Sequence, residues 1–581
     1  MKAVFEADVR VPMRDGVTLA TSVWRPAGDE KVPAVMMRTP YQKDDLKLGV
    51  LMLPGQIALL RAGYAVIAQD VRGTFRSDDS FVPHSQDLLD GEDTIRWLAE
   101  QPWCDGNVGM YGPSYLGLVQ WQAAAADTPA LKAIVPMVTC ADIYSLWYSR
   151  GGALSLQLLL FWSTIMALNA AMRALPGGKA DLADIQQLAA TLQNPDPLYW
   201  AKPVGDQPLL KKYLPWFDDV MAHPMRDDFW KALSVVDRAE KVTTPALSIV
   251  GWYDLYATQQ LRDHQAFSQR AGSAQARAGQ RLLIGPWSHM VHGQFGVFGD
   301  RDFGPAANAL AFGFDEVHVN FFDRWLKGRE GALDGTAPVR LFVMGINQWR
   351  DEQAWPLPDT NYVDYFLGGA GPANTAGGAG LLTTNRPAHD MVDRYLYDPL
   401  RPVPTVGGDT LDMRTDGPRD QSAIETRDDV LCFTTAVLDE PVEVTGPVTL
   451  KLFVSSSAPD TDFTAKLVDV SPDGRAIILC HGVLRMRYRQ SLDSCDLMKP
   501  DEIYEIDIDV GATSNVFLPG HRIRLEVSSS NFPRYDRNSN TGGDINSESA
   551  GDMIVALNKV HRGPARPSRI ILPVIPANRS S

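Results

Sequence analysis

The chain has 581 residues, of which 45% are hydrophobic and 22% charged, as expected of a globular protein with two to four domains. Its net charge is -15, and an acidic surface repels phosphate groups, so neither nucleic acid nor an anionic membrane is an expected partner. Five scattered cysteines without a Cys-x-x-Cys pair indicate neither a disulfide framework nor a zinc site, and they fit a reducing, cytoplasmic compartment.

The first 140 residues alternate between predicted strands and helices. Residues 1–8 carry Glu and Asp where a signal peptide would need an apolar run, so no leader is expected. Strand-like runs at 8–12 and 18–25 flank a hairpin turn at Arg14-Asp-Gly16. Further nearly continuous apolar runs predict strands buried on both faces of a parallel sheet. These strands are expected at 32–38, 64–69 and 131–138, with a helix at 88–100.

A sharp turn at Gly112-Pro-Ser114 separates a predicted strand, Asn107 to Tyr111, from a predicted helix, Tyr115 to Ala126. Gly112 and Gly117 remove side chains where the strand and helix backbones would otherwise collide. A serine on such a turn is held clear of both elements, as in a nucleophile elbow, here with the spacing Gly-x-Ser-x-x-Gly. The alternative is an ordinary junction with Ser114 as a helix N-cap.

The strand–helix alternation stops near Cys140, and residues 141–238 read as helices and loops rich in Trp. An insertion in an α/β sheet usually covers the carboxyl ends of the strands, so a helical cap over the site is expected. The apolar run Leu154 to Ala174 has almost the length of a membrane span. Because it contains Gln157 and Arg173, we interpret it as a buried or pocket-facing helix.

Two residues in the second half of the core complete a candidate catalytic triad. Asp254 and His289 each follow a predicted strand directly. A serine nucleophile needs a base and an orienting acid, which follow it in the order Asp, then His, in folds with this elbow. Ser114, Asp254 and His289 are therefore the predicted triad, with His292 as the close competitor for the base. An Asp or His at a loop start can also be a cap or a solvated residue.

An oxyanion formed at Ser114 would need two hydrogen-bond donors. The backbone N–H of Tyr115, at the start of a helix, is the first candidate. The loop after the third strand lacks the Gly-rich signature that usually supplies the second donor. Pro40 fixes the turn there, so the phenol of Tyr41 is a candidate, although a partly buried packing role is the alternative.

After about Trp349 the sequence changes to short β-rich runs, most clearly from Val430 onward, with few helical patterns. Such runs, separated by Gly, Pro, Asn and Asp turns, predict a sandwich or jelly roll. The expected division is 1–140 for the first part of the α/β core, 141–238 for the cap, 239–348 for the second part of the core and 349–581 for the jelly roll.

Five segments of the chain form a recognisable set. They are Arg38-Thr-Pro-Tyr41, Asp70-Val-Arg-Gly73, Gly112-Pro-Ser-Tyr-Leu-Gly117, Gly251-Trp-Tyr-Asp254 and Gly285-Pro-Trp-Ser-His289. These segments resemble the bacterial cocaine esterase family, whose broader group includes α-amino-acid ester hydrolases, glutaryl acylases and X-prolyl dipeptidyl peptidases. The resemblance covers essentially the whole chain. It implies an α/β-hydrolase core with an inserted helical cap and a C-terminal jelly roll. It also implies that the Tyr41 hydroxyl joins the Tyr115 N–H in the oxyanion hole.

The resemblance further implies that Trp147, Trp162 and Tyr256 line the acyl pocket, with Tyr256 in place of a Phe. The loop at residues 407–412 departs from the family pattern, because it is shorter and more acidic. From Asp409 and Asp412 we expect carboxylate-bearing acyl groups to be poor substrates.

These features together predict a metal-independent serine esterase that needs no cofactor and hydrolyses a small-molecule ester through an acyl-enzyme. Whether the protein forms a homodimer is left open. One alternative is an α-amino-acid ester hydrolase, acylase or X-Pro dipeptidyl peptidase. Another, from a different class, is a carbohydrate- or surface-binding protein that acts through the jelly roll.

Overall fold

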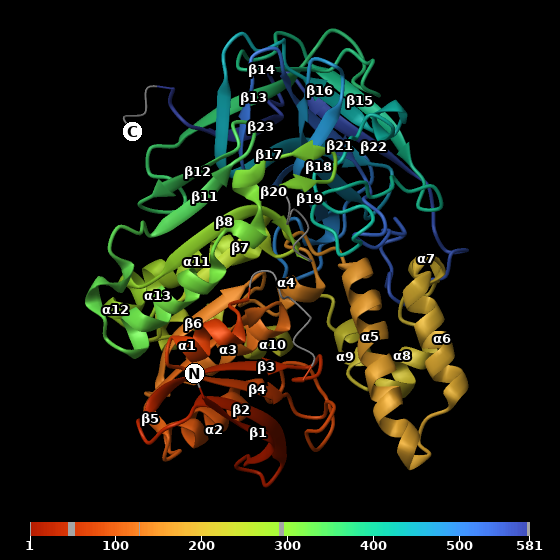
Figure 1. Ribbon diagram of the computed structural model, residues 1–581. Coiled ribbons are helices and arrows are strands. Elements are labelled where there is room, and N and C mark those ends of the chain that lie inside the picture. The colour runs from red at the N-terminus through yellow and green to blue at the C-terminus, as the bar shows by residue number, and fades with distance from the viewer. Residues whose placement is uncertain (1, 45–52, 127, 290–295, 578–581) are drawn as a thin grey trace.

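The computed structural model describes residues 2–44, 53–126, 128–289 and 296–577 (Figure 1). The segment before the cap and the segment that follows it build one ten-stranded sheet. Its strands are β1 (Ala3–Pro12), β2 (Thr18–Pro26), β3 (Val32–Thr39), β4 (Ala65–Asp70), β5 (Cys104–Pro113), β6 (Leu131–Met137), β7 (Leu247–Tyr253), β8 (Arg281–Ser288), β11 (Val339–Val343) and β12 (Gln348–Glu352).

The strand order in this sheet is β1-β2-β4-β3-β5-β6-β7-β8-β11-β12. The strands from β3 to β8 and β11 run parallel, and β1, β2 and β12 run antiparallel to their neighbours. The predicted hairpin and buried parallel strands are therefore confirmed. The sheet includes β12 and so extends four residues beyond the expected core boundary at 348. Carboxyl ends of parallel strands share one edge, which brings the ends of β5, β7 and β8 together.

Helices pack on both faces of this sheet, and the predicted helix at 88–100 is α2. Every residue of α3 is buried, so this helix lies in the protein core. The core helices are α1 (Gln56–Arg61), α2 (Asp87–Ala99), α3 (Tyr115–Ala125), α11 (Ala257–Arg270), α12 (Ala274–Ala278) and α13 (Phe314–Leu326). Shorter elements are β9 (Val297–Phe298), β10 (Arg301–Asp302), η3 (Pro305–Ala307), η4 (Ala309–Ala311) and η5 (Glu330–Leu333).

The cap is helical, as the sequence predicts, and projects beside the core on the right of Figure 1. By length and composition, Leu156–Gly177 would also pass as a membrane span, but half of its apolar window is buried inside the protein. The cap elements are α4 (Tyr144–Trp147), α5 (Leu156–Ala174), η1 (Leu175–Gly177), α6 (Leu182–Gln193), α7 (Asp196–Trp200), α8 (Pro208–Tyr213), α9 (Phe217–Ala222), α10 (Asp228–Leu233) and η2 (Val236–Lys241).

The C-terminal part is a β-sandwich of eleven strands, consistent with the predicted jelly roll. Its first strands come well before Val430, where the sequence pattern becomes clear. The strands are β13 (Asn361–Gly368), β14 (Leu381–Thr383), β15 (Met391–Tyr397), β16 (Leu431–Thr434), β17 (Val442–Ser456), β18 (Asp462–Val470), β19 (Ala476–Arg485), β20 (Tyr504–Phe517), β21 (Arg522–Ser528), β22 (Ala556–Arg562) and β23 (Arg569–Val574). Two single turns, η6 (Ile424–Thr426) and η7 (Met486–Tyr488), accompany them.

The cap and the sandwich meet at the segment before α5. Arg485 N donates to the Gly151 carbonyl at 2.8 Å, and a Cβ on Gly151 would lie 1.9 Å from the Val483 carbonyl oxygen. Leu154 N donates to Asp536 Oδ1 at 2.9 Å. Because the segment before α5 makes these contacts through its main chain, the sandwich fixes the position at which α5 begins.

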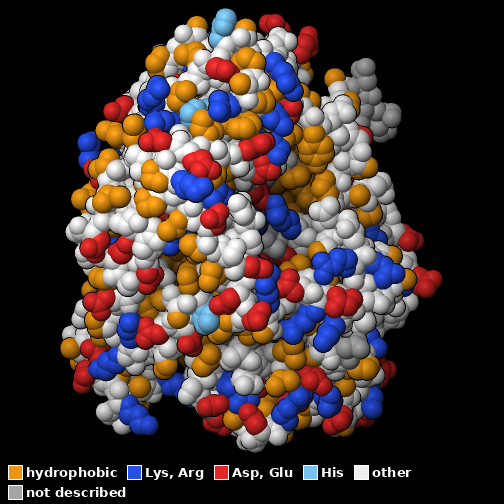
Figure 2. All heavy atoms as spheres, turned by 180° about the vertical axis from the view of Figure 1, so that it is seen from behind, with side chains coloured by type: hydrophobic (Ala, Val, Ile, Leu, Met, Phe, Trp, Pro, Cys, Tyr) orange, Lys and Arg blue, Asp and Glu red, His pale blue; other side chains and the backbone are white. Residues whose placement is uncertain are grey.

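The surface carries charges of both signs despite the net charge of -15. On the described surface that Figure 2 shows, Lys and Arg side chains are interspersed with Asp and Glu, and no broad patch of one sign appears.

Candidate active site

Ser114 lies at the junction of β5 and α3 with φ 58° and ψ -123°, a conformation that a non-glycine residue adopts only at a cost. Gly112, with φ 139°, permits the turn, because a Cβ there would lie 2.7 Å from Leu116 Cβ. A Cβ on Gly117 would lie 2.6 Å from Thr139 Cγ2. Gly117 therefore makes room for a side chain that follows β6, and not for the β5 backbone as predicted. The geometry is that of a nucleophile elbow.

The structure brings the three predicted triad residues together. His289 Nε2 lies 3.1 Å from Ser114 Oγ, and His289 Nδ1 lies 2.7 Å from Asp254 Oδ2. Asp254 is completely buried, and its other oxygen accepts a hydrogen bond from Tyr256 N at 2.8 Å. This chain of contacts lets the imidazole accept the serine proton while the carboxylate holds the ring. His292, the alternative base, lies outside the described residues.

Tyr41 lies at the turn that follows β3, close to the elbow. Its N–H donates to Thr39 Oγ1 at 3.0 Å, and its phenol oxygen accepts a hydrogen bond from Trp162 Nε1 at 2.9 Å. The same hydroxyl contacts the Ser114 side chain. Asp70 begins the segment Asp70-Val-Arg-Gly73. Its side chain accepts a hydrogen bond from Lys43 N at 2.6 Å and so holds the loop that carries Tyr41. Tyr41 and Ser114 therefore line the same cavity.

Tyr115 supplies the other candidate donor, and its side chain is anchored on the far side of the elbow. Its hydroxyl donates to Asp87 Oδ2 at 2.5 Å, and its ring stacks on His84 with centroids 4.9 Å apart. Burial lowers the pKa of His84 to about 3, so this imidazole is neutral. Because Tyr115 begins α3, its backbone N–H has no intrahelical acceptor and is free to face an anion.

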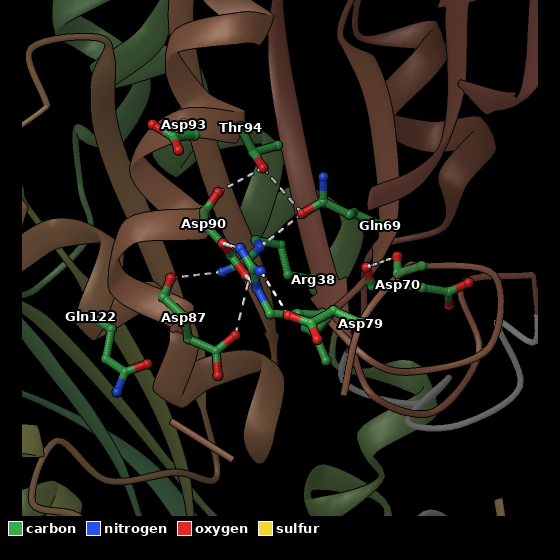
Figure 3. A network of polar contacts seen from close by, with 12 residues as sticks. Arg38, Gln69, Asp70, Asp79, Asp87, Asp90, Asp93, Thr94 and Gln122 are labelled. Carbon is green, nitrogen blue, oxygen red and sulfur yellow. Dashed lines mark hydrogen bonds and ion pairs between the residues drawn. The ribbon is translucent and has the colours of Figure 1, made fainter. Parts of the chain in front are cut away.

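Asp87 belongs to a buried polar network around Arg38 (Figure 3). Arg38 Nη1 donates to the Asp87 carbonyl, and Arg38 Nε donates to Gln69 Oε1, each at 2.9 Å. Burial raises the pKa of Asp87, whereas Arg38 and Tyr115 lower it. Arg72 Nη2 donates to the neighbouring Asp90 at 2.7 Å. The sequence motifs contain Arg38 and Arg72 but indicate no role for them. Asp87 was not predicted, because nothing in its sequence spacing indicates the contact with Tyr115.

A cavity of about 420 Å³ opens at Ser114 and His289. Trp147, Trp162 and Tyr256, the three residues expected around the acyl group, all line this cavity. The Tyr256 ring also meets the His289 ring edge to face, with centroids 5.4 Å apart. One part of the wall comes from the sandwich domain. It consists of Leu411, Asp412, Met413 and Arg414. Of these, Met413 and Arg414 lie beyond the 407–412 loop and were not predicted.

The expected acidity of the 407–412 loop is not seen at this cavity. Asp409 faces away from it, toward His481 Nε2 at 2.8 Å and Arg534 Nε at 2.9 Å. Asp412 does line the cavity, but Arg414 pairs with it at 2.6 Å. The two loop carboxylates are therefore compensated and supply no net repulsion to an anionic acyl group.

Comparison with known proteins places the chain in a family. Residues 15–291 match the model of the X-Pro dipeptidyl-peptidase (S15 family), and residues 330–571 match the X-Pro dipeptidyl-peptidase C-terminal non-catalytic domain. Cocaine esterase from Rhodococcus sp. (strain MB1 Bresler) is 50% identical over 572 residues, which is 98% of each chain. The chain belongs to the cocaine esterase family.

As a member of the cocaine esterase family, the chain is a serine hydrolase of carboxylic esters with an α/β-hydrolase fold. Two solved structures share the whole architecture at 25% identity. An aminopeptidase from a marine sediment Thaumarchaeota archaeon has a TM-score of 0.80 and covers 99% of this chain and 97% of its own. An α-amino acid ester hydrolase has a TM-score of 0.79 and covers 98% and 96%.

Among the described residues of this family member, no group of three or more His, Cys, Asp or Glu side chains could hold a metal ion.

Proposed function

We propose that Ser114, His289 and Asp254 hydrolyse carboxylic esters through an acyl-enzyme. The observation that carries this proposal is the position of the His289 ring, with one nitrogen 3.1 Å from Ser114 Oγ and the other 2.7 Å from Asp254. Ser114 Oγ attacks the ester carbonyl while His289 Nε2 takes its proton. His289 then gives that proton to the departing alcohol, and water, activated in the same way, releases the acid.

The tetrahedral intermediates place negative charge on the former carbonyl oxygen. In this proposal the Tyr115 N–H and the Tyr41 hydroxyl donate hydrogen bonds to that oxygen. Donors fixed in advance stabilise the transition state more than the substrate, which raises kcat. The contact between the Tyr41 hydroxyl and Ser114 supports this assignment.

The acyl group proposed for this site is compact and apolar. Trp147, Trp162 and Tyr256 offer flat aromatic walls, and such pairs are worth about 0.5–1.5 kcal/mol beyond the area they bury. The relative from Rhodococcus is named for cocaine, which makes cocaine a compound to test here. A small-molecule ester is the only partner that this proposal requires.

The alternative is an enzyme specific for α-amino acyl groups, as the names of the two solved structures suggest for those proteins. Recognition of an ammonium group needs unpaired carboxylates near the acyl group. Asp412 is the one carboxylate among the described residues that line the cavity, and Arg414 binds both of its oxygens at 2.6 and 2.9 Å. This pairing favours a neutral acyl group.

A panel of p-nitrophenyl esters tests the acyl preference. We expect butyryl and benzoyl esters to be hydrolysed efficiently, with glutaryl and aminoacyl esters far poorer, because an apolar cavity desolvates a charged group without a partner. The quantity to compare is kcat/KM, with the corresponding anilides as the test for amide cleavage. If the aminoacyl ester or the anilide were the best substrate, the acyl preference proposed here would be replaced by the aminopeptidase or acylase alternative.

The pH dependence of hydrolysis tests the protonation state of Tyr41. Burial raises the pKa of Tyr41 to about 12, although hydrogen bonds with Trp162 and Ser114 lower it. Since a raised pKa keeps the hydroxyl protonated to higher pH, activity should stay level beyond about pH 10, the ordinary tyrosine value. A decline centred near that value would show that Tyr41 ionises in the free enzyme.

The division into two core parts, a cap and a jelly roll is also proposed, with the end of β12 at Glu352 as a better core boundary than 348. A cytoplasmic location is supported by the five cysteines, all of which are unpaired. Size-exclusion chromatography would decide whether the protein is a homodimer.

A further inference from the structure

The hydroxyl oxygen of Tyr41 accepts a hydrogen bond from a fixed donor. Trp162, on α5 in the cap, donates its indole N–H to the Tyr41 oxygen at 2.9 Å, across a gap of 121 residues in the sequence. A phenol oxygen carries one proton and can accept hydrogen bonds, whereas an indole N–H can only donate. The Tyr41 proton therefore cannot point at Trp162. It must point to another partner, and the Ser114 side chain is in contact with the same oxygen.

The indole is held firmly enough to set this direction. The Trp162 ring packs against Trp147 and Trp216 in the cap, with centroids 5.4 and 5.6 Å apart. It also stacks at 12° on the ring of Tyr115, whose backbone supplies the other proposed donor. Near the start of α5, Gln157 N donates to the Pro533 carbonyl at 3.1 Å, which ties the helix to the sandwich. Neighbours from the cap, the core and the sandwich thus determine where the Trp162 N–H points.

We propose that Trp162 is a positioning residue for the oxyanion hole, in that its indole N–H directs the Tyr41 hydroxyl proton toward the oxyanion formed at Ser114. This inference rests on the proposed role of Tyr41. It adds a second effect, because a phenol that donates to an anion gains negative charge on its oxygen, and a donor to that oxygen strengthens the bond. Both effects are larger in the transition state than in the ground state, so Trp162 acts mainly on kcat.

A wall residue and a positioning residue respond differently to replacement of the indole. Trp162→Phe keeps an aromatic ring at the cavity and removes the N–H. If Trp162 is a positioning residue, Trp162→Phe should lower kcat by about tenfold for acetyl, butyryl and benzoyl esters alike, with little change in KM. This loss is part of the 10²–10³ that removal of a whole donor costs. If Trp162 is only a wall of the cavity, Trp162→Phe should change the ranking of the three esters.

The decisive experiment is a double-mutant cycle of Trp162→Phe with Tyr41→Phe, read as kcat. If Trp162 acts through Tyr41, adding Trp162→Phe to the Tyr41→Phe variant should cause no further loss. Equal losses in both backgrounds would overturn the inference while leaving the oxyanion role of Tyr41 intact. If Tyr41→Phe alone kept full kcat, the proposed function of Tyr41 would fail first, and the two failures are therefore distinguishable.

Two further variants separate the N–H from the packing of the ring. Replacement of Trp162 by benzothienylalanine puts a sulfur atom in place of the indole N–H and preserves the shape, so kcat should fall as it does in Trp162→Phe. Trp230→Phe is the matched control, because it also removes a buried indole N–H, one that donates to the His223 carbonyl at 2.7 Å. Trp230 packs on Tyr144 and Tyr148 and is not among the described residues that line the cavity. This variant should keep kcat within about twofold, which is within the error of treating separate sites as independent. An unchanged kcat in the benzothienylalanine variant would overturn the inference.

Discussion

Ser114→Ala should abolish ester hydrolysis, with kcat lowered by about 10⁶, because the triad acts as one unit and nothing else in it can form the acyl-enzyme. The fold should persist. Only main-chain atoms of Ser114 hold the elbow, since its N–H donates to the Met137 carbonyl and its own carbonyl accepts from Thr139 Oγ1 at 2.8 Å. Steady-state kinetics, with the melting temperature measured in parallel, checks both statements.

Labelling by a fluorophosphonate probe tests independently whether Ser114 is the nucleophile. The wild-type protein should be labelled at Ser114, and Ser114→Ala should not be labelled. Ser145→Ala is the matched control, because Ser145 Oγ donates to Asp142 Oδ2 in the cap and is not among the residues that line the catalytic cavity. Labelling that survived in Ser114→Ala would assign the nucleophile to another serine.

The assignment of the base can be tested by the same steady-state kinetics. His289→Ala should be nearly as inactive as Ser114→Ala, since loss of either residue stops proton transfer. His292→Ala should retain activity. The reverse pattern would assign the base to His292.

Tyr41→Phe should lower kcat by about 10²–10³, or about 2.7–4 kcal/mol, with much less effect on KM. The loss falls on kcat because the phenol meets its full partner only when the carbonyl oxygen becomes an anion. The aromatic ring, the Pro40 turn and the bond from Tyr41 N to Thr39 remain, so the loop should keep its shape. Kinetics on one good ester, together with a circular dichroism melt, measures this effect.

Tyr213→Phe is the control for loss of a phenol hydroxyl. Its hydroxyl donates to Asp184 in the cap, and it is not among the residues that line the cavity. It should keep kcat and at most lower the melting temperature. If Tyr41→Phe behaved in the same way, Tyr41 would be a packing residue, and the oxyanion would depend on the Tyr115 N–H alone.

The sequence predicted the hydrolase core well because its physical signals are local. Strands such as β3 and β4 are buried on both faces of a parallel sheet, so they appear as uninterrupted apolar runs. The early strands of the sandwich gave no such signal. β13 has the sequence Asn-Tyr-Val-Asp-Tyr-Phe-Leu-Gly and is held mainly by pairing with β23, about two hundred residues later, which no local pattern reveals.

The same contrast holds within the site. Ser114, Asp254 and His289 could be predicted because each follows a strand, and parallel strands end at one edge of the sheet. Asp87 and the donor role of Trp162 could not be predicted, because tertiary packing alone brings them to Tyr115 and Tyr41. The expected repulsion of anionic acyl groups by Asp409 was wrong for the same reason. Its partners His481 and Arg534 lie far along the chain, so the sequence does not reveal that its charge is compensated.

The loop at 411–414 makes the sandwich domain part of the cavity wall. Leu411 and Met413 line the catalytic cavity but belong neither to the sheet nor to the elbow. A library randomised at these two positions would therefore sample new cavity shapes while leaving the proton-transfer machinery untouched. In directed evolution of this enzyme, the most productive changes for new esters would then accumulate in a domain whose family model is described as non-catalytic.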